Sequence, residues 1–348
     1  MNLKSQENLG KIDDPNAVSR KNDHISLAFD AQMSLIDIDN RFYYEPFLAP
    51  HPQKDDLQLD FLGKKMKVPM WVSSMTGGTE KAKHINTNLA LVCNKFGMGM
   101  GLGSCRSLLF SDEHLADFNI RHIIGDENPL FANLGIAQVE SLIENNQLSK
   151  IASLIEKLQA DGLIIHVNPL QEYMQPEGDR FKVSPIQTIE KVLEKLDIKL
   201  IVKEVGQGFG PNSLRKLLKL PLAAIDFAAS GGTNFALLEL LRSQENLAIT
   251  QLPFTKVGHS AIEMITFANE LINELGEKVL CNQLIISGGI HNFLDGYYCI
   301  KKSKIKSIFG QASTFLKYAI EDTPDELIRF TQKQIEGLSL ANSYLIPK

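Results

Sequence analysis

The chain is poor in the features that mark several classes of protein. Its four cysteines, Cys93, Cys105, Cys281 and Cys299, stand apart without C-x-x-C spacing, so the sequence predicts neither a zinc site nor a disulfide framework. No apolar run is long enough to span a bilayer, and the first ten residues lack the apolar stretch of a signal peptide. We therefore expect a cytoplasmic protein without a membrane partner.

Basic residues are not in excess either. With 36 Lys and Arg against 41 Asp and Glu, the formal net charge is −5, which gives no reason to expect a nucleic acid as partner. Any anion site must therefore be a local cluster of basic groups. A hydrophobic content of 44% and a length of 348 residues fit an ordinary globular protein with one large barrel or two smaller domains.

The dominant pattern is a repeated unit of an apolar strand, a small polar loop and an amphipathic helix. In one helical segment, for example, Ile151, Leu154, Ile155 and Leu158 recur at the spacing of a single buried face. Eight strands are predicted, at 68–73, 97–102, 129–134, 162–167, 199–204, 222–227, 282–287 and 306–309. Helices are predicted at 84–96, 139–158, 185–196, 211–219, 234–243, 258–275 and 312–320.

Eight alternating strands and helices favour the α/β class, as a (β/α)8 TIM barrel, over an open doubly wound sheet. No G-x-G-x-x-G follows the first strand, which argues against a dinucleotide-binding Rossmann domain. We place the barrel at 66–348 and treat 1–65 as an N-terminal extension with a short hairpin around Gly63. The stretch 244–257 interrupts the repeat and is predicted to be an insertion near the sixth barrel helix.

In a barrel of this kind the chemistry lies at the C-terminal ends of the strands. The fourth strand ends in L-I-I-H-V-N-P-L-Q-E at 163–172, which brings His166, Asn168, Gln171 and Glu172 within seven positions. A carboxylate suits a hard cation such as Mg²⁺, and amides can both donate and accept hydrogen bonds. Taken alone, the stretch fits a strand-end cap better than a functional site.

Small residues follow several other strands. They form S-S-M-T-G-G at 73–78, A-A-S-G-G-T-N at 228–234, S-G-G-I-H at 287–291 and G-Q-A-S at 310–313. Such turns can hold a phosphate on backbone N–H groups, and the last strands are the usual phosphate corner of a barrel. The second strand, G-M-G-M-G-L-G at 97–103, places its glycines on one face, open to a flat group or to another element of the fold. Together these features favour a flat cofactor that carries a phosphate, and FMN fits that description.

With these motifs the sequence resembles the type 2 isopentenyl diphosphate isomerases, which are FMN-dependent barrel enzymes. The resemblance runs from Arg20 to Lys317 and is carried by R-K-N-D-H-I, M-T-G-G, G-L-G-S-C-R, H-V-N-P-L-Q-E, V-K-E-V-G, S-G-G-T-N-F and S-G-G-I. The H-x-N-x-x-Q-E block is the most specific of them. The resemblance implies interconversion of isopentenyl diphosphate and dimethylallyl diphosphate with reduced FMN and Mg²⁺, NADPH as flavin reductant, and a homo-oligomer.

The resemblance also implies roles for individual residues. The residues expected to bind substrate are Arg20, Lys21, His24, Ser104, Arg106 and Gln171, and the residue expected to bind Mg²⁺ is Glu172. The residues expected to act in catalysis are Gln171, His166 and Asn168, with the reduced flavin as the source of the proton. The residues expected to bind FMN are Ser74, Met75, Thr76, Ser104, Asn133, Lys203, Thr233, Gly288, Gly289, Ala312 and Ser313.

Three features depart from the family pattern. His291 stands where the family usually has Arg, Ala229 stands where it usually has Gly, and 252–260 replaces a segment that contains Trp. A histidine can donate to phosphate but is charged only at lower pH, so we expect weaker flavin retention than is usual in the family, and a further loss as the pH rises.

Two other functions stay open. The first is a barrel that binds a diphosphate but has lost catalysis. The second is an FMN-dependent enzyme like the 2-hydroxy acid oxidases, which share the barrel. Such an oxidase needs a His–Arg pair after the seventh strand, and the Arg is missing at 291.

Overall fold

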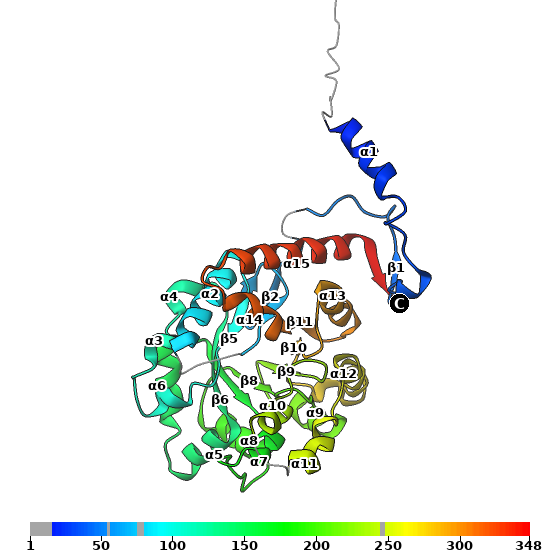
Figure 1. Ribbon diagram of the computed structural model, residues 1–348. Coiled ribbons are helices and arrows are strands. Elements are labelled where there is room, and N and C mark those ends of the chain that lie inside the picture. The colour runs from blue at the N-terminus through cyan, green and yellow to red at the C-terminus, as the bar shows by residue number, and fades with distance from the viewer. Residues whose placement is uncertain (1–15, 54–55, 75–79, 244–247) are drawn as a thin grey trace, which may run out of the picture. The chain divides into compact units, whose positions relative to one another are not determined.

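A computed structural model describes residues 16–53, 56–74, 80–243 and 248–348 of the chain (Figure 1). The chain divides into two compact units, one ending at Tyr43 and including Lys348, the other spanning Tyr44–Pro347. The first unit contains α1 (Ala17–Leu27) and the short 3-10 helix η1 (Leu35–Asp37). Two further strands have three residues each: β1 (Phe42–Tyr44), which spans the boundary between the units, and β12 (Leu345–Pro347), which ends the second unit.

Eight parallel strands close into a barrel in the second unit, and the predicted TIM barrel is confirmed. Neighbouring strands follow the order β10-β11-β4-β5-β6-β7-β8-β9. They are β4 (Met70–Val72), β5 (Gly99–Gly101), β6 (Leu130–Gly135), β7 (Gly162–His166), β8 (Leu200–Lys203), β9 (Ala224–Asp226), β10 (Gln283–Ser287) and β11 (Lys306–Gln311). Each lies within or beside a stretch predicted from the sequence.

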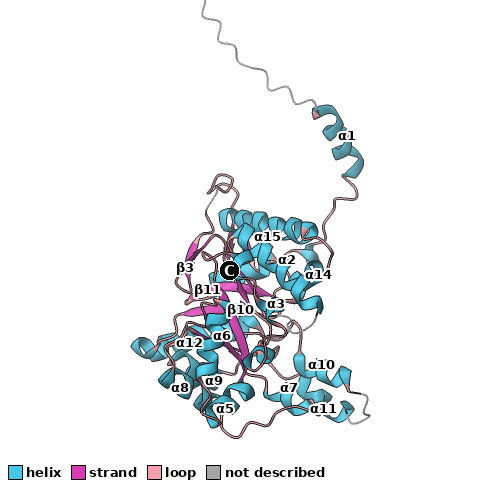
Figure 2. Ribbon diagram, turned by 90° about the vertical axis from the view of Figure 1, so that its left-hand side faces the viewer, coloured by secondary structure: helices cyan, strands magenta, loops and turns pink. Residues whose placement is uncertain are grey.

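Helices surround these strands on the outside (Figure 2). The longer ones are α2 (Glu80–Phe96), α5 (Ile136–Glu144), α6 (Ser149–Leu158), α8 (Pro185–Lys195), α9 (Pro211–Leu218), α10 (Phe235–Arg242), α11 (Ala248–Thr255), α12 (Ala261–Leu275), α13 (Phe293–Lys302), α14 (Ser313–Ala319) and α15 (Asp325–Tyr344). The shorter ones are η2 (Arg106–Leu109), α3 (Leu115–Phe118), α4 (Arg121–Ile124), α7 (Pro169–Met174) and η3 (Gly276–Lys278). Among the described residues, no helix combines the length and the apolar character needed to cross a bilayer.

Two helix predictions need correction. The single helix expected at 139–158 is two helices, α5 and α6, because the chain turns at Asn146, whose φ is 55°. Asparagine tolerates this left-handed conformation better than most residues. The long helix α15, the helix α13 and the shorter helices α3, α4, α7 and α11 were not predicted. Gly296 interrupts the amphipathic pattern of α13. A glycine is needed at this position because a Cβ would lie 2.5 Å from a ring carbon of Phe309.

A hairpin closes the N-terminal end of the barrel. Its strands, β2 (Leu59–Phe61) and β3 (Lys64–Met66), are joined at Leu62 and Gly63, both with positive φ, so the hairpin expected around Gly63 is present. Phe61, Leu62 and Met66 pack into the same core as the inward side chains of the barrel. The tip is fixed by the Leu62 N–H, which donates to Gln283 Oε1 at 2.8 Å.

The glycine face of β5 does not receive a cofactor, which corrects the sequence interpretation. A Cβ on Gly99 would lie 2.4 Å from Trp71 Cζ3, and one on Gly101 would lie 2.6 Å from Ile164 Cδ1. The flat group against this face is therefore the indole of Trp71, which is fully buried in the barrel core.

We predict that Gly99→Ala lowers the unfolding free energy by about 1–3 kcal/mol, because the added methyl overpacks the barrel core against Trp71. Gly210→Ala is the control, since its Cβ would find the nearest side-chain atom, of His259, at 3.6 Å. Urea unfolding followed by circular dichroism measures both. Equal stability of the two variants would contradict the packing described for Gly99.

Candidate active site

Strand geometry places a polar layer directly above the apolar core. Side chains two residues apart point to the same face of a strand. The core holds one inward residue from most strands, Trp71, Phe131, Ile164, Ile201, Ala224, Ile285 and Ile308. The residues two positions later are Ser73, Asn133, His166, Lys203, Asp226, Ser287 and Gly310. The barrel interior therefore changes from apolar to polar within one layer, at the C-terminal ends of the strands.

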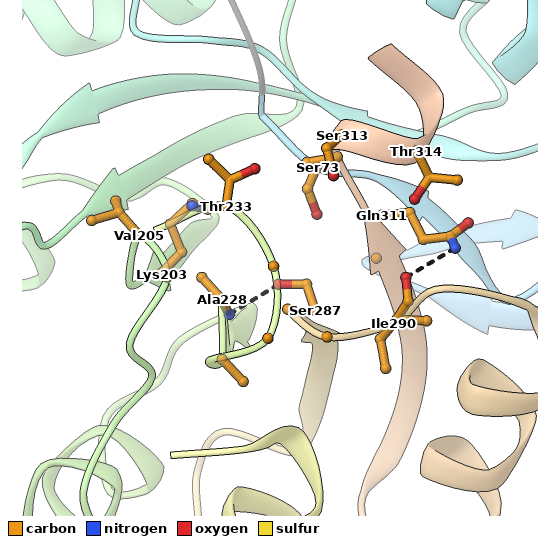
Figure 3. A pocket seen from close by; sticks show the side chains of 18 of the residues that line it. Ser73, Lys203, Val205, Ala228, Thr233, Ser287, Ile290, Gln311, Ser313 and Thr314 are labelled. Carbon is orange, nitrogen blue, oxygen red and sulfur yellow. Dashed lines mark hydrogen bonds between the residues drawn. The ribbon is translucent and has the colours of Figure 1, made fainter. Parts of the chain in front are cut away.

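A cavity of about 370 Å³ opens at this end, between the loops that follow β4, β8, β9, β10 and β11 (Figure 3). Seven of the residues predicted to bind FMN line it: Ser74, Lys203, Thr233, Gly288, Gly289, Ala312 and Ser313. Lys203 and His291 are the basic residues among those that line it, and no acidic residue is among them. The cavity therefore suits a ligand with negative charge.

Two glycine turns form one side of the cavity by direct backbone contact. Gly231, Gly288 and Gly289 have φ values of 106°, 85° and 69°, which side chains rarely permit. A Cβ on Gly288 would lie 2.0 Å from the Ala229 carbonyl oxygen, so the two turns interlock without room for a side chain. Ala229 itself is buried and lies outside the positive-φ residues, so the alanine is accommodated where the family usually has glycine.

Three buried oxygens at the cavity have no hydrogen-bond partner among the described residues. They are Ser73 Oγ, Ser74 Oγ and Gln311 Oε1. The amide of Gln311 is held in place, because its Nε2 donates to the Ile290 carbonyl at 3.1 Å (Figure 3). Buried polar atoms normally have partners, so these three indicate a polar ligand in the cavity.

Lys203 extends from β8 into the cavity wall. Its ammonium donates to the Glu204 carbonyl oxygen at 2.7 Å. The Glu204 carboxylate points elsewhere and accepts the N–H groups of Gly206, Gln207 and Gly208 on one oxygen, at 2.5–2.9 Å. Glu204 thus shapes the loop after β8, whereas Lys203 supplies the charge.

His166 stands beside Lys203 in register and is held in the neutral form. Burial and the nearby charge of Lys203 lower the pKa of His166 to about 3. Its Nδ1 lies 2.9 Å from Asn133 Oδ1, and Asn133 Nδ2 donates to the Leu102 carbonyl at 3.0 Å. This arrangement assigns the proton to Nδ1 and leaves Nε2 as an acceptor.

The remaining residues of the 163–172 stretch form a hydrogen-bonded cluster. Asn168 Nδ2 donates to Gln171 Oε1 at 3.0 Å and to Glu172 Oε1 at 3.1 Å. Gln171 Nε2 donates to Glu239 Oε1 on α10 at 3.1 Å, and Glu239 also pairs with Arg242. Asn168 Oδ1 is buried and lacks a partner among the described residues.

The oxygens of Glu172 and Asn168 are the groups of this cluster that could bind a cation. Glu172 accepts one hydrogen bond on each carboxylate oxygen, from Asn168 and from the Asp179 N–H. In the described part of the chain, no three His, Cys, Asp or Glu side chains are grouped as a metal site. A Mg²⁺ ion here would take Glu172 and amide oxygens from the protein and complete its shell with water or ligand oxygens.

Arg106 lies at the edge of this cluster. Its guanidinium is 3.5 Å from Asp179 Oδ2, which also accepts from Gln138 Nε2 at 3.2 Å. Both members of the ion pair are partly exposed, so the pair is weak and Arg106 is available to an anionic ligand.

Other predicted residues lie elsewhere. Ser104 is exposed, and Asn133 is buried against His166; neither lines the cavity. Arg20, Lys21 and His24 lie on α1 in the first unit. Met75 and Thr76 lie outside the described residues.

No individual role was predicted for Ser73, Asp226, Ser287, Gln311 or Glu239, although the turns at 73–78, 287–291 and 310–313 contain three of them. The signal for the first three was present, since each lies two positions beyond an inward apolar residue of its own strand. Glu239 gave no such signal, because its contact with Gln171 joins two helices.

Comparison with solved structures shows the fold. A flavocytochrome b2 variant with pyruvate bound matches with a TM-score of 0.58 and 14% identity, over 86% of this chain and 71% of that one. A mandelate oxidase variant with an FMN adduct matches with a TM-score of 0.54 and 12% identity, over 88% of both chains.

Comparison with curated proteins shows the family, although no family model matches the chain. The isopentenyl-diphosphate delta-isomerase of Rickettsia typhi (strain ATCC VR-144 / Wilmington) is 33% identical over 309 residues, which cover 87% of this chain and 86% of the relative. That of Rickettsia prowazekii (strain Madrid E) is 35% identical over 265 residues, covering 76% and 74%. The resemblance found in the motifs is thus confirmed, and the chain belongs to the isopentenyl-diphosphate delta-isomerase family.

Proposed function

We propose that the protein interconverts isopentenyl diphosphate and dimethylallyl diphosphate, with FMN in the cavity and Mg²⁺ at Glu172. The observation that carries the proposal is the cavity itself. It combines the Lys203 ammonium, interlocked glycine turns and three buried oxygens without partners among the described residues. These groups fit a flat anionic ring with a phosphate tail, and the family membership supplies the reaction.

The residues around the cavity divide between the two ends of FMN. The turns at Gly231–Thr233 and Gly288–Gly289, together with Ala312 and Ser313, would hold the phosphate on backbone N–H groups and hydroxyls. Ser73, Ser74 and Lys203 would lie along the ring, where the ammonium offsets negative charge. When bound and reduced, FMN would supply the proton and the stabilising negative charge for the allylic isomerisation.

The substrate would lie between this cavity and the Asn168–Glu172 cluster. Arg106 would bind the diphosphate. The assignment of Arg20, Lys21 and His24, on α1 of the first unit, to the same role stays a prediction from the sequence. Glu172 and Asn168 Oδ1 would hold Mg²⁺, which offsets the diphosphate charge. Gln171, held at both ends of its amide by Asn168 and Glu239, would face the isoprenoid carbons in a fixed orientation.

His166 acts in this proposal as a neutral acceptor and not as an acid. Its Nε2 can accept a hydrogen bond, and the low pKa keeps the ring uncharged beside Lys203. The strong acid needed to protonate an alkene would then be supplied by bound, reduced FMN. NADPH as flavin reductant, a homo-oligomeric assembly and a cytoplasmic location belong to the same proposal.

The experiment that tests the proposal is reconstitution. The purified full chain should turn yellow with FMN, bleach on anaerobic addition of NADPH, and then convert isopentenyl diphosphate to dimethylallyl diphosphate when Mg²⁺ is present. Protein that stays colourless but binds the diphosphate would favour a binding role. Oxidation of a 2-hydroxy acid in its place would favour the oxidase alternative.

Glu172→Gln should lower Mg²⁺-dependent turnover by at least about 100-fold while flavin absorbance stays, because an amide binds the cation far more weakly than a carboxylate. Glu177→Gln is the control, since Glu177 lies shortly after α7, the helix that carries Glu172, but is exposed. Initial rates at several Mg²⁺ concentrations measure the effect. Equal loss in both variants would remove Glu172 as the metal ligand.

The pKa of His166 gives a prediction for stability. The unfolded histidine takes up a proton below pH about 6.5, whereas folded His166 resists protonation until pH about 3, so its neutral form is what the fold stabilises. The stability of the wild type should therefore fall as the pH drops from 6.5 to 3, by up to about 1 kcal/mol per pH unit from this residue. His166→Gln should lack this share of the slope. Thermal unfolding of both proteins across pH 4–7 measures it, and parallel slopes would contradict the assignment.

A further inference from the structure

Asp226 is a buried carboxyl for which the proposed reaction has no use. It ends β9, has no exposed surface, and stands next to Lys203 in register. Its Oδ1 accepts the Ser287 hydroxyl at 2.5 Å, while Oδ2 has no partner among the described residues. Burial raises the pKa of Asp226. A buried carboxyl with one unpaired oxygen destabilises a fold, so its presence here suggests a role other than stability.

Ser287 links Asp226 to the cavity wall through its hydroxyl group. The same Ser287 oxygen that donates to Asp226 accepts the Ala228 N–H at 2.9 Å (Figure 3). Ala228 lines the cavity and has a φ of 41°, in the left-handed region that a residue with a side chain disfavours. The backbone at Ala228 therefore needs an outside contact to stay in this conformation.

The position of Ala228 matters because both glycine turns depend on it. The next residue, Ala229, touches Gly288 so closely that a Cβ there would lie 2.0 Å from the Ala229 carbonyl oxygen. The Ala229 N–H also donates to the Ser287 carbonyl at 2.8 Å. A shift at Ala228 would thus move the Gly231–Thr233 turn and the Gly288–Gly289 turn together.

We propose that Asp226 is a positioning residue that, through the Ser287 hydroxyl, holds the left-handed turn at Ala228 and so keeps the two glycine turns shaped for the anionic end of the cofactor. Asp226 itself does not line the cavity. The inference rests on the proposed flavin function, because FMN is the ligand used to read it out.

The titratable groups near Asp226 are Lys203, in register on β8, and beyond Lys203 the side chains of His166 and Glu204. An electrostatic role toward Lys203 is therefore the competing account. Asp226→Asn separates the two accounts, since an amide oxygen can still accept from Ser287 but carries no charge. Asp226→Leu removes both the acceptor and the charge at similar volume.

The experiment titrates FMN into the purified full chain and follows the fluorescence of Trp71, the one tryptophan of the sequence, which lies directly below Ser73 of the cavity. We expect Asp226→Leu to bind FMN about tenfold more weakly, the change that loss of one ordinary hydrogen bond gives. Asp226→Asn should stay within about twofold of the wild type. Ala228→Gly added to Asp226→Leu should restore most of the affinity, because glycine adopts this φ without an outside contact.

The unfolding temperature distinguishes a positioning role of Asp226 from a purely structural one, because loss of a structural residue would lower it together with the FMN affinity. Asp226→Leu should unfold at the same or a higher temperature than the wild type, since it removes a half-satisfied buried carboxyl. Asp117→Leu is the control, because Asp117 is also buried with an oxygen that lacks a hydrogen-bond partner among the described residues, but it lies on α3 away from the cavity. Its FMN affinity should equal that of the wild type.

The outcomes separate the inference from the proposed function. If the wild type does not bind FMN, the proposed function fails. If the wild type binds and Asp226→Leu binds equally well, the inference alone is wrong. Equal losses in Asp226→Asn and Asp226→Leu, or no restoration by Ala228→Gly, would assign the effect to charge and overturn the role through the turn.

Discussion

The site depends on the two-residue period of the barrel strands. When one side chain of a strand points into the barrel interior, the side chain two residues later also points inward, one layer closer to the C-terminal end of the strand. Trp71 and Ile201 fill the lower level, and Ser73 and Lys203 follow above them. The same constraint that closes the core thus places polar groups at the mouth, on strands that cannot shift without unpacking the core.

That placement buries several polar side chains, and each of them is accommodated in a different way. His166 stays neutral, and Lys203 donates to the Glu204 carbonyl oxygen. Asp226 is the least satisfied of these groups. Sites often retain such groups at the expense of stability, since function depends on polar atoms that the fold alone would not select.

Much of this arrangement could be predicted from the sequence. The alternation of apolar strands and amphipathic helices gave the barrel, and small-residue turns after the late strands located the cavity. The glycine face of β5 was misread, because a bare strand face does not say whether a ligand or a side chain covers it, and here Trp71 does. The contact between Gln171 and Glu239 could not be predicted, because it joins two helices that are far apart in the sequence and no local pattern shows that they pack together. Family membership then supplied the reaction, which the geometry alone supports only as anion binding.

The central claim is that the cavity holds a flavin whose reduced form acts without net oxidation. The most direct measurement is the number of dimethylallyl diphosphate molecules formed for each NADPH consumed, under anaerobic conditions with FMN and Mg²⁺. We expect many product molecules for each NADPH, since the flavin needs to be reduced only once. One product molecule for each NADPH would contradict it.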